Sequence, residues 1–273
     1  MSDASRRPGA GLDTSVPNIA RMNNYFLGGK DNFAADRRAA EEVLAVAPEV
    51  REMTHQAQEF LGRITRYLVG EGMTQFVVIG SGLPNRRNVH QVAQEIAPGT
   101  RVVYVSNDPV VLSHARATLA TNAHTGVVEG DVMHPSELLT DPELLRLVDL
   151  DLPVAVLILS ALQFIPDEDD PHKSVAVLRD AVPVGSHFAI GHVVFDTRPE
   201  EARSAVVEIF QRVLGRGEDA SRRSEEVLRF FDGLDLVDPG LVYIRHWHPD
   251  NPLTAQGRDR AWTMGGVARK SRG

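Results

Sequence analysis

The chain has 273 residues, a formal net charge of −8 and a hydrophobic content of 42%, which is ordinary for a globular protein with a substantial core. It contains no cysteine, which excludes disulfide bonds and thiolate chemistry. No apolar run is long enough to span a membrane, the N-terminus lacks the apolar core of a signal peptide, and Lys and Arg form no basic stripe. We therefore expect a cytoplasmic protein with neither a membrane nor a nucleic-acid partner.

The first 72 residues are predicted to form a disordered tail followed by helices. Residues 1–12 are polar and contain glycine and proline, which predicts disorder. Helix formers fill 35–50, and that helix is expected to stop near Pro48. Over 50–72 the apolar side chains recur on one helical face, and two glycines close the pattern. The helical region is thus 13–72, and an α/β domain follows over 73–273.

From Gln75 onward, short apolar runs alternate with helical segments. Nearly all-apolar strands separated by helices are typical of a parallel sheet covered on both faces. The last two runs have no helix between them, which predicts a hairpin added to the sheet. We therefore expect a doubly wound, mostly parallel, Rossmann-like α/β sheet. The expected strands are 75–79, 101–105, 126–130, 153–160, 187–194, 241–247 and 261–270.

The first strand ends in a glycine turn. In open α/β sheets, ligands bind outside the carboxyl ends of the strands. Gly80, Ser81 and Gly82 follow the first strand, where glycine permits a tight turn and close contact with a ligand. The helix expected from Asn88 points its amide-rich N-terminus at the same place. Pro84 replaces the third glycine of the dinucleotide fingerprint, so a tight turn without a ligand is the alternative.

Ser106, Asn107 and Asp108 follow the second strand. A carboxylate at this place holds the two hydroxyls of a ribose, and Asp108 is the candidate. Capping of the helix that begins at Pro109 is the slightly favoured alternative role for Asp108.

The third and fourth strands end in further candidate ligand contacts. Asp131 can accept a hydrogen bond from an exocyclic amine, and the Val132 amide can donate to a ring nitrogen, so the pair can read an adenine edge. The alternative for Asp131 is capping of the next helical segment, which is expected over 135–150. Ser160 is expected to form part of the pocket floor. The acids at 167–170 predict a helix start at Pro171 rather than a metal site.

No catalytic residue is assigned from the sequence. His192 and Asp196 follow the fifth strand and are the candidates for a general base and its helper, with ordinary loop residues as the alternative. His246 and His248 are expected to share one face of a late strand rather than to bind a metal. The sequence lacks a nucleophile elbow, which argues against Ser-His-Asp catalysis.

These strand-end motifs, in this order, resemble class I S-adenosylmethionine-dependent methyltransferases. More narrowly, the chain looks like an actinobacterial S-adenosyl methyltransferase family over nearly its whole length. The resemblance implies a seven-stranded sheet with an antiparallel last strand and a helical cap over the cofactor, S-adenosylmethionine. It also places Lys30 and Asn32, in the motif "GGKDN", near the pocket, where Lys30 can pair with a cofactor carboxylate; a helix C-cap glycine and a turn are the alternative. The resemblance rests on 25–37, 80–90, 102–116, 164–171 and 225–242.

Several positions depart from the family pattern, always towards less charge. The family pattern usually has Asp at the position of Val78, which helps to order the turn and the methionine amine, and Asp at the position of Ser106, which holds the ribose. Losing both contacts would weaken cofactor binding by roughly two to four powers of ten. We expect all the altered positions to face the pocket. The others are Asn24 for Asp, Ala57 and Gln58 for Asn-Arg, and Gln163 for His.

Two functions follow from these observations. The first is an S-adenosylmethionine-dependent methyltransferase acting on a small molecule. The alternative is a protein of this fold that has lost methyl transfer and serves as a binding module or a cofactor-independent enzyme. The acidic balance and the cap favour a small substrate over a nucleic acid. A homodimer is a further expectation, without a specific sequence signal.

Overall fold

The computed structural model describes residues 13–85, 87–197, 199–215, 220–255 and 262–272, so the predicted tail at 1–12 lies outside the described residues. A central sheet has the strand order β3-β2-β1-β4-β5-β8-β6, and β7 also pairs with β8. The first five strands are parallel, and β8 runs antiparallel to β5. The predicted doubly wound α/β class and the antiparallel last strand are confirmed. The main strands are β1 (Gln75–Ile79), β2 (Arg101–Ser106), β3 (Thr125–Glu129), β4 (Ala155–Leu159), β5 (His187–Val193) and β8 (Thr263–Arg269).

The remaining strand of the predicted seven is split into two short pieces. β6 (Asp235–Leu236) and β7 (Val242–Tyr243) pair with opposite ends of β8. The predicted strand 241–247 is wrong beyond Tyr243, because η4 (Ile244–His246) is a 3₁₀ turn. The guanidinium of Arg63 donates to the carbonyls of Ile244 and Trp247, at 2.6 and 2.9 Å, and holds this turn against α3 (Val50–Gly70). His246 and His248 therefore do not share a strand face.

Helices cover both faces of the sheet because alternate strand residues point to opposite sides. Phe76 and Val78 pack on one side with α3, α4 (Val89–Ile96) and α5 (Pro109–Thr118). Val77 and Ile79 pack on the other side. The helices there are α6 (Pro135–Leu138), α7 (Pro142–Leu147), α8 (Pro171–Asp180) and the segment of α10 (Ser224–Leu228) with η3 (Arg229–Phe231). The single helical segment expected over 135–150 is thus two short helices, and Asp141 caps the second.

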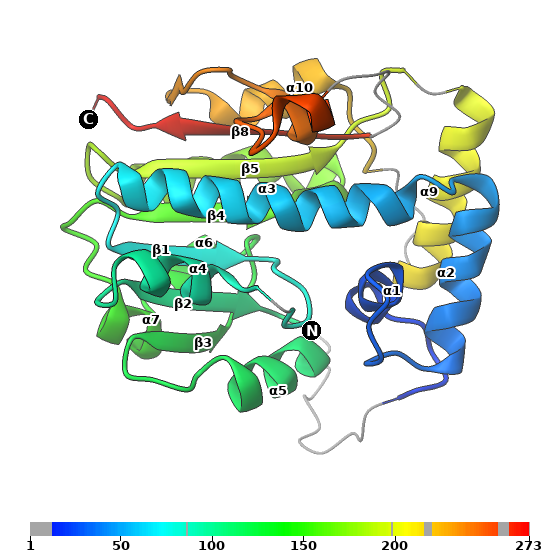
Figure 1. The fold of residues 1–273 in the computed structure, drawn as a ribbon, viewed down its shortest axis with the longest axis horizontal. Coiled ribbons are helices and arrows are strands. Elements are labelled where there is room, and N and C mark those ends of the chain that lie inside the picture. Colours follow the sequence, from blue (N-terminus) through cyan, green and yellow to red (C-terminus); the bar gives the residue numbers. More distant parts are fainter. Residues whose placement is uncertain (1–12, 86, 198, 216–219, 256–261, 273) are drawn as a thin grey trace, which may run out of the picture.

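A cap lies beyond the carboxyl ends of the parallel strands (Figure 1). It combines α1 (Ile19–Phe26) and α2 (Ala34–Val46) with α9 (Glu200–Leu214), which comes from the other end of the sequence. Met22, Phe26 and Val43 pack with Phe210 and Val213 in one apolar cluster. The cap therefore depends on a late helix as well as on the N-terminal region.

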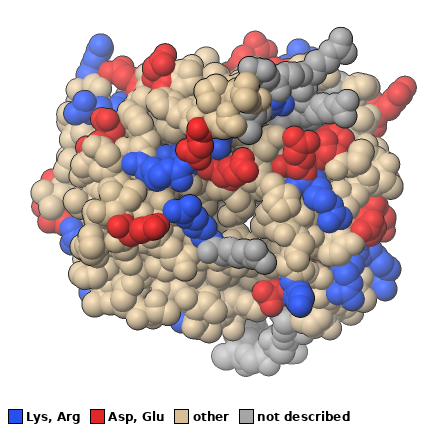
Figure 2. Space-filling view, in the orientation of Figure 1, with Lys and Arg blue, Asp and Glu red and all other residues tan. Residues whose placement is uncertain are grey.

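The surface shows no large patch of one charge on the face drawn in Figure 2, where acidic and basic side chains are interspersed. No helix in the described ranges is long and apolar enough to cross a membrane.

Candidate functional site

A cavity of about 880 Å³ lies between the cap and the carboxyl ends of the strands. Its volume is within the range of about 300–1,000 Å³ that is typical of small-molecule sites. The segments after β1 to β4 form one wall, and α1, the first turns of α3, and α9 form the others. The predicted residues that line it are Gly80, Ser81, Gly82, Ser106, Asn107, Asp108, Asp131, Val132 and Ser160.

Lys30 and Asn32 do not line this cavity. Lys30 is exposed, so its predicted pairing with a cofactor carboxylate has no support from the geometry. Asn32 is buried one step behind the cavity wall and donates from Nδ2 to the Oδ1 of Asn24 and the carbonyl of Gly29, both at 3.0 Å. Asn24 itself lines the cavity. Because a Cβ on Gly29 would lie 2.4 Å from the Asn24 amide, this motif holds Asn24 in place.

The two glycines after β1 have different reasons to be glycine. Gly80 has φ +76°, and a Cβ there would lie 2.8 Å from the Ala161 Cβ and 2.9 Å from the Leu159 carbonyl. Contact with the end of β4 therefore explains Gly80 without a ligand. Gly82 has φ +70° and no atom within 4 Å of a built Cβ, so it borders open space in the cavity. Only Gly82 leaves room for close contact with a ligand.

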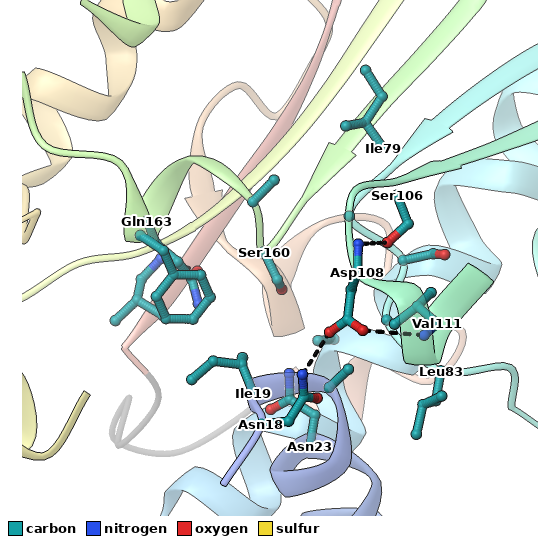
Figure 3. A pocket seen from close by; sticks show the side chains of 18 of the residues that line it. Asn18, Ile19, Asn23, Ile79, Leu83, Ser106, Asp108, Val111, Ser160 and Gln163 are labelled. Atoms are coloured by element: carbon teal, nitrogen blue, oxygen red, sulfur yellow. Dashed lines mark hydrogen bonds between the residues drawn. The ribbon is translucent and has the colours of Figure 1, made fainter. Parts of the chain in front are cut away.

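Asp108 caps α5, as the favoured interpretation of the sequence predicted, and it also fastens α1. Its Oδ1 accepts from the amides of Val110 and Val111, and its Oδ2 accepts from the Nδ2 of Asn18 at 2.6 Å (Figure 3). Asn18 is the N-cap of α1 and accepts from the amide of Arg21. One hydrogen bond thus joins the caps of two helices across the cavity. It uses the Asp108 carboxylate, which is also the sequence-based candidate for contact with a ribose.

We expect the N18A variant to lose about 1–3 kcal/mol of unfolding free energy, because it removes an N-cap and a charge-assisted hydrogen bond. Urea unfolding measures this as a lower midpoint at an unchanged slope. The matched variant is N23A, since Asn23 lines the same cavity from α1 and makes no side-chain hydrogen bond within the described residues. Equal midpoints for N18A and N23A would contradict the fastening role of Asn18.

Asp131 is held by its neighbours at the end of β3. Its Oδ2 accepts from the Nδ2 of Asn107 at 2.7 Å, and its Oδ1 accepts from the amide of Met133 at 2.9 Å. Asp131 does not cap α6, whose N-cap is His134. Each carboxylate oxygen keeps lone pairs for a further donor, so the predicted contact with an exocyclic amine remains compatible with this geometry.

Ser160 holds a strained backbone conformation at the end of β4. Its φ is +60°, in the left-handed region that non-glycine residues rarely adopt. Such strain persists where the surroundings enforce it, and it clusters at binding and catalytic sites. The Ser160 side chain lies in the cavity between the glycine turn and the β4–α8 segment (Figure 3).

A buried arginine shapes the β4–α8 segment that lines the cavity. Arg222 is 3% exposed and donates to the carbonyls of Leu162 and Ile165 at 2.9 and 2.7 Å. It also donates to the carboxylate of Asp167 at 2.6 Å and to the Nε2 of His192 at 3.1 Å. Residues 163–165 of the clamped segment line the cavity, so Arg222 positions part of the wall without touching the open space.

His192 and Asp196 are not placed as a general base and its helper. His192 is fully buried outside the cavity lining, and burial lowers its pKa to about 4. Its Nδ1 faces the Val193 carbonyl, which can only accept, so Nδ1 carries the proton and Nε2 accepts from Arg222. Asp196 accepts hydrogen bonds from the amide and hydroxyl of Ser224. Both residues therefore serve the structure around α10.

Comparisons with known proteins agree with this geometry. The model of a family described as S-adenosyl methyltransferase matches residues 5–271. The chain belongs to this S-adenosyl methyltransferase family. The crystal structure of a DUF574 family protein from Streptomyces avermitilis MA-4680 is 35% identical with a TM-score of 0.88, covering 94% of this chain and 99% of that one. A candidate methyltransferase from Thermobifida fusca YX is 36% identical with a TM-score of 0.89, covering 98% and 100%.

More distant likeness shows the shared fold alone. The plantazolicin methyltransferase BamL, in complex with a triazolic desmethylPZN analog and SAH, is 8% identical with a TM-score of 0.53, covering 92% of this chain and 96% of that one. No curated protein matches the chain by sequence. The predicted resemblance to an actinobacterial S-adenosyl methyltransferase family is thus confirmed by the family model and the two close structures.

The expectation that all departures from the S-adenosyl methyltransferase pattern face the pocket is wrong for Val78. Its side chain is fully buried on the α3 side of the sheet, whereas its neighbour Ile79 lines the cavity. Strand alternation is the reason, since adjacent residues point to opposite faces. Ala57 packs against the same apolar cluster as Val78. The departures that do line the cavity are Asn24, Ala57, Gln58, Ser106 and Gln163.

Other residues that line the cavity were missed from the sequence. Asn18 and Asn23 come from α1, whereas Val206, Phe210 and Val213 come from α9. The spacing of the three α9 residues is that of one helical face, which was a signal for a buried side. It did not reveal that this side would face a cavity formed with α1 and α3.

The cavity has room for a neutral or nucleoside-like molecule, but it offers few groups for proton transfer. Within the described ranges, the ionisable side chains that line it are Asp108, Asp131, His134 and Asp169, and no Lys or Arg does so. The described residues contain no group of three His, Cys, Asp or Glu side chains arranged for a metal ion. Positioning and exclusion of water are the means that this lining provides.

Proposed function

We propose that the chain is an S-adenosylmethionine-dependent methyltransferase that acts on a small molecule. The observation that carries this proposal is the single cavity that brings together nine predicted cofactor contacts in a member of the S-adenosyl methyltransferase family. S-adenosylmethionine, when bound, supplies a methyl group on a positively charged sulfur, so the protein has mainly to orient and enclose the reactants.

The residues at the strand ends fit the adenosine part of that cofactor. Gly82 leaves open space beside the turn after β1. Ser106 and Asn107 offer a hydroxyl and an amide to ribose hydroxyls, and Asp131, held by Asn107, offers its free lone pairs to the adenine amine. The Val132 amide is the candidate donor to an adenine ring nitrogen.

The size of the cavity and its lining from both the cap and the sheet support a small acceptor. α1 closes over the strand ends through the Asn18–Asp108 hydrogen bond, and α9 closes the other side of the cavity. The cavity volume of about 880 Å³ is that of a small-molecule site, whereas a polymer would need a groove that runs across the surface. The cap would also exclude water from the reaction, which strengthens electrostatic contacts within the site.

A second candidate is a family member that binds a ligand without transferring methyl groups. The observation that favours it is the lack of any Lys or Arg among the described lining residues, which leaves no side-chain cation for the methionine carboxylate. The Asp108 carboxylate is also engaged by Asn18 and two backbone amides. Such a protein would bind adenosine-like or neutral molecules better than the charged cofactor.

Calorimetric titration with S-adenosylhomocysteine and adenosine tests the proposal. We expect saturable binding of S-adenosylhomocysteine, and we expect S106D to raise its affinity by about 10- to 100-fold, because a carboxylate can accept from both ribose hydroxyls. S106N is the uncharged control of the same size. The gain should vanish with 2′,3′-dideoxyadenosine in place of adenosine.

The two candidates differ in the same titration. Binding of adenosine without binding of S-adenosylhomocysteine at millimolar concentration would favour the protein that does not transfer methyl groups. The absence of saturable binding for both ligands would contradict the assignment of the strand ends as a nucleoside site.

A further inference from the structure

The half of the cavity farthest from the strand-end acids is apolar and aromatic. Asp108 and Asp131 follow β2 and β3, whereas this half adjoins the ends of β5 and β8, on the other side of β1 in the sheet. We call it the apolar compartment and define it by lining residues from α3, the β4–α8 segment, β5, α9 and the start of β8. They are Met53, Phe164, Val193, Val206, Phe210 and Trp262.

The aromatic side chains of the apolar compartment present rings rather than polar groups. Phe164 lies against Phe210 with ring centroids 5.7 Å apart and planes at 52°. Trp262 is held by Phe195 at 5.4 Å, and its indole Nε1 donates to the Glu49 carboxylate at 3.1 Å. Trp262 is 2% exposed and packs with Met53 and Val206 in one apolar cluster, so these three residues form the packed end of the compartment, and Phe164 and Phe210 are its more accessible rings.

The polar side chains that α3 and the start of the β4–α8 segment place beside the apolar compartment are uncharged, and Asp169, five residues beyond Phe164, is the carboxylate of that segment that lines the cavity within the described residues. The Thr54 hydroxyl donates to the Val50 carbonyl at 2.8 Å, and the Gln163 Oε1 accepts from the Val193 amide at 3.3 Å. The Gln163 NH₂ group therefore remains as a donor. Gln58 is half-buried, and its side chain makes no hydrogen bond among the described residues. A buried charge without a partner is costly, whereas a hydroxyl or neutral amine can pair with an amide group.

We propose that the apolar compartment binds the methyl acceptor, and that this acceptor is an uncharged aromatic molecule carrying a hydroxyl or amine that faces Gln58 and Gln163. This inference rests on the proposed function, since it assigns the acceptor side of the same cavity. The tilted rings of Phe164 and Phe210 supply an edge and a face for a flat ligand. The two glutamines orient its polar group, and none of the six residues that define the compartment carries a charge that could pair with an ionic analogue.

Three ligands that share one ring system test the charge preference. 2-Naphthol, 2-naphthoate and 2-naphthylmethylammonium are titrated into the full chain at neutral pH by calorimetry. We expect 2-naphthol to bind at least about tenfold more tightly than either ion, because only the ions carry an uncompensated charge into the compartment. Equal affinities for the three ligands, or no saturable binding of 2-naphthol at millimolar concentration, would overturn the proposal.

Single-residue variants test whether 2-naphthol binds in the apolar compartment. F210A is expected to weaken the binding of 2-naphthol by about tenfold or more, and F210L is expected to weaken it by less. E208A lies on the exposed side of the same helix and should leave the affinity for 2-naphthol unchanged. Q58E is expected to reverse the preference towards 2-naphthylmethylammonium by about tenfold, and it does not alter the apolar packing. If F210A binds 2-naphthol as E208A does, or if Q58E leaves the preference unchanged, the assignment is wrong.

Titration with S-adenosylhomocysteine separates this inference from the proposed function. If S-adenosylhomocysteine binds and 2-naphthol does not, the aromatic acceptor is wrong and the methyltransferase assignment stands. If 2-naphthol binds and S-adenosylhomocysteine does not, the aromatic site stands and its role as an acceptor site is wrong.

Discussion

The R222M variant is expected to lose about 3 kcal/mol or more of unfolding free energy, since each buried acceptor left without a donor costs about 1–3 kcal/mol. The methionine side chain is similar in length but donates no hydrogen bond. It would leave the Ile165 carbonyl and the Nε2 of His192 without their donor, whereas the Leu162 carbonyl would keep the amide of Ile165 at 3.1 Å. It would also remove the guanidinium from its place 5.2 Å from the centre of the Phe230 ring. Urea unfolding measures the loss.

The same variant tests whether Arg222 acts on the cavity. Leu162 adjoins the cavity wall and Ile165 belongs to it, so release of the segment should weaken the binding of S-adenosylhomocysteine as well as lower stability. R222K, which keeps the charge with fewer donors, should fall between R222M and the wild type. The matched control is R223M, because Arg223 is exposed and next in the chain; its effect should stay within about 0.5 kcal/mol. An R222M variant as stable as R223M would contradict the conclusion that Arg222 holds the β4–α8 segment in place.

The V78D variant is expected to destabilise the protein by about 3–5 kcal/mol at pH 8, because it places a carboxylate without a partner in a fully buried apolar cluster. Val78 lies on the central strand β1 between Tyr104 of β2 and Leu157 of β4. It does not line the cavity, so restoring the family's acid there would not by itself add a cofactor contact. Unfolding free energy is measured at two pH values.

The pH dependence distinguishes charge from size. Burial raises the pKa of a carboxyl, so the folded V78D protein holds a proton more readily than the unfolded chain. Its stability should therefore fall as the pH rises, and the loss at about pH 5 should be smaller than at about pH 8. V78N has nearly the same volume without the charge and should show no such dependence. The double variant A57N/V78D should recover part of the loss, since Ala57 borders the same cluster. A V78D protein as stable as the wild type at pH 8 would contradict this account of the core.

The sequence was sufficient for the sheet and for the strand-end half of the cavity. Short apolar runs alternating with helices specify a parallel sheet, and that topology brings the residues after β1, β2, β3 and β4 to one edge. Gly82, Ser106, Asp131 and Ser160 were therefore placed together by position alone. The capping role of Asp108 followed from its place before Pro109.

The other half of the cavity depends on contacts between distant segments, which local patterns do not specify. α9 joins α1 and α2 in the cap, and Arg222 reaches back to the segment after β4. The side-chain direction of Val78 could have been predicted from the local sequence, because strand alternation places it opposite to that of Ile79. His192 was misplaced for the same reason, since Val193 is the residue of β5 that lines the cavity.

A crystal of the full chain soaked with S-adenosylhomocysteine tests the central claim most directly. We predict ligand density along the turn Gly80–Gly82, with the ribose at Ser106 and Asn107 and the adenine beside Asp131. The apolar compartment around Phe210 should remain open beside the ligand. Density for the ligand at another place, or a cavity filled by its own side chains at millimolar ligand, would contradict the claim that this cavity is the cofactor site.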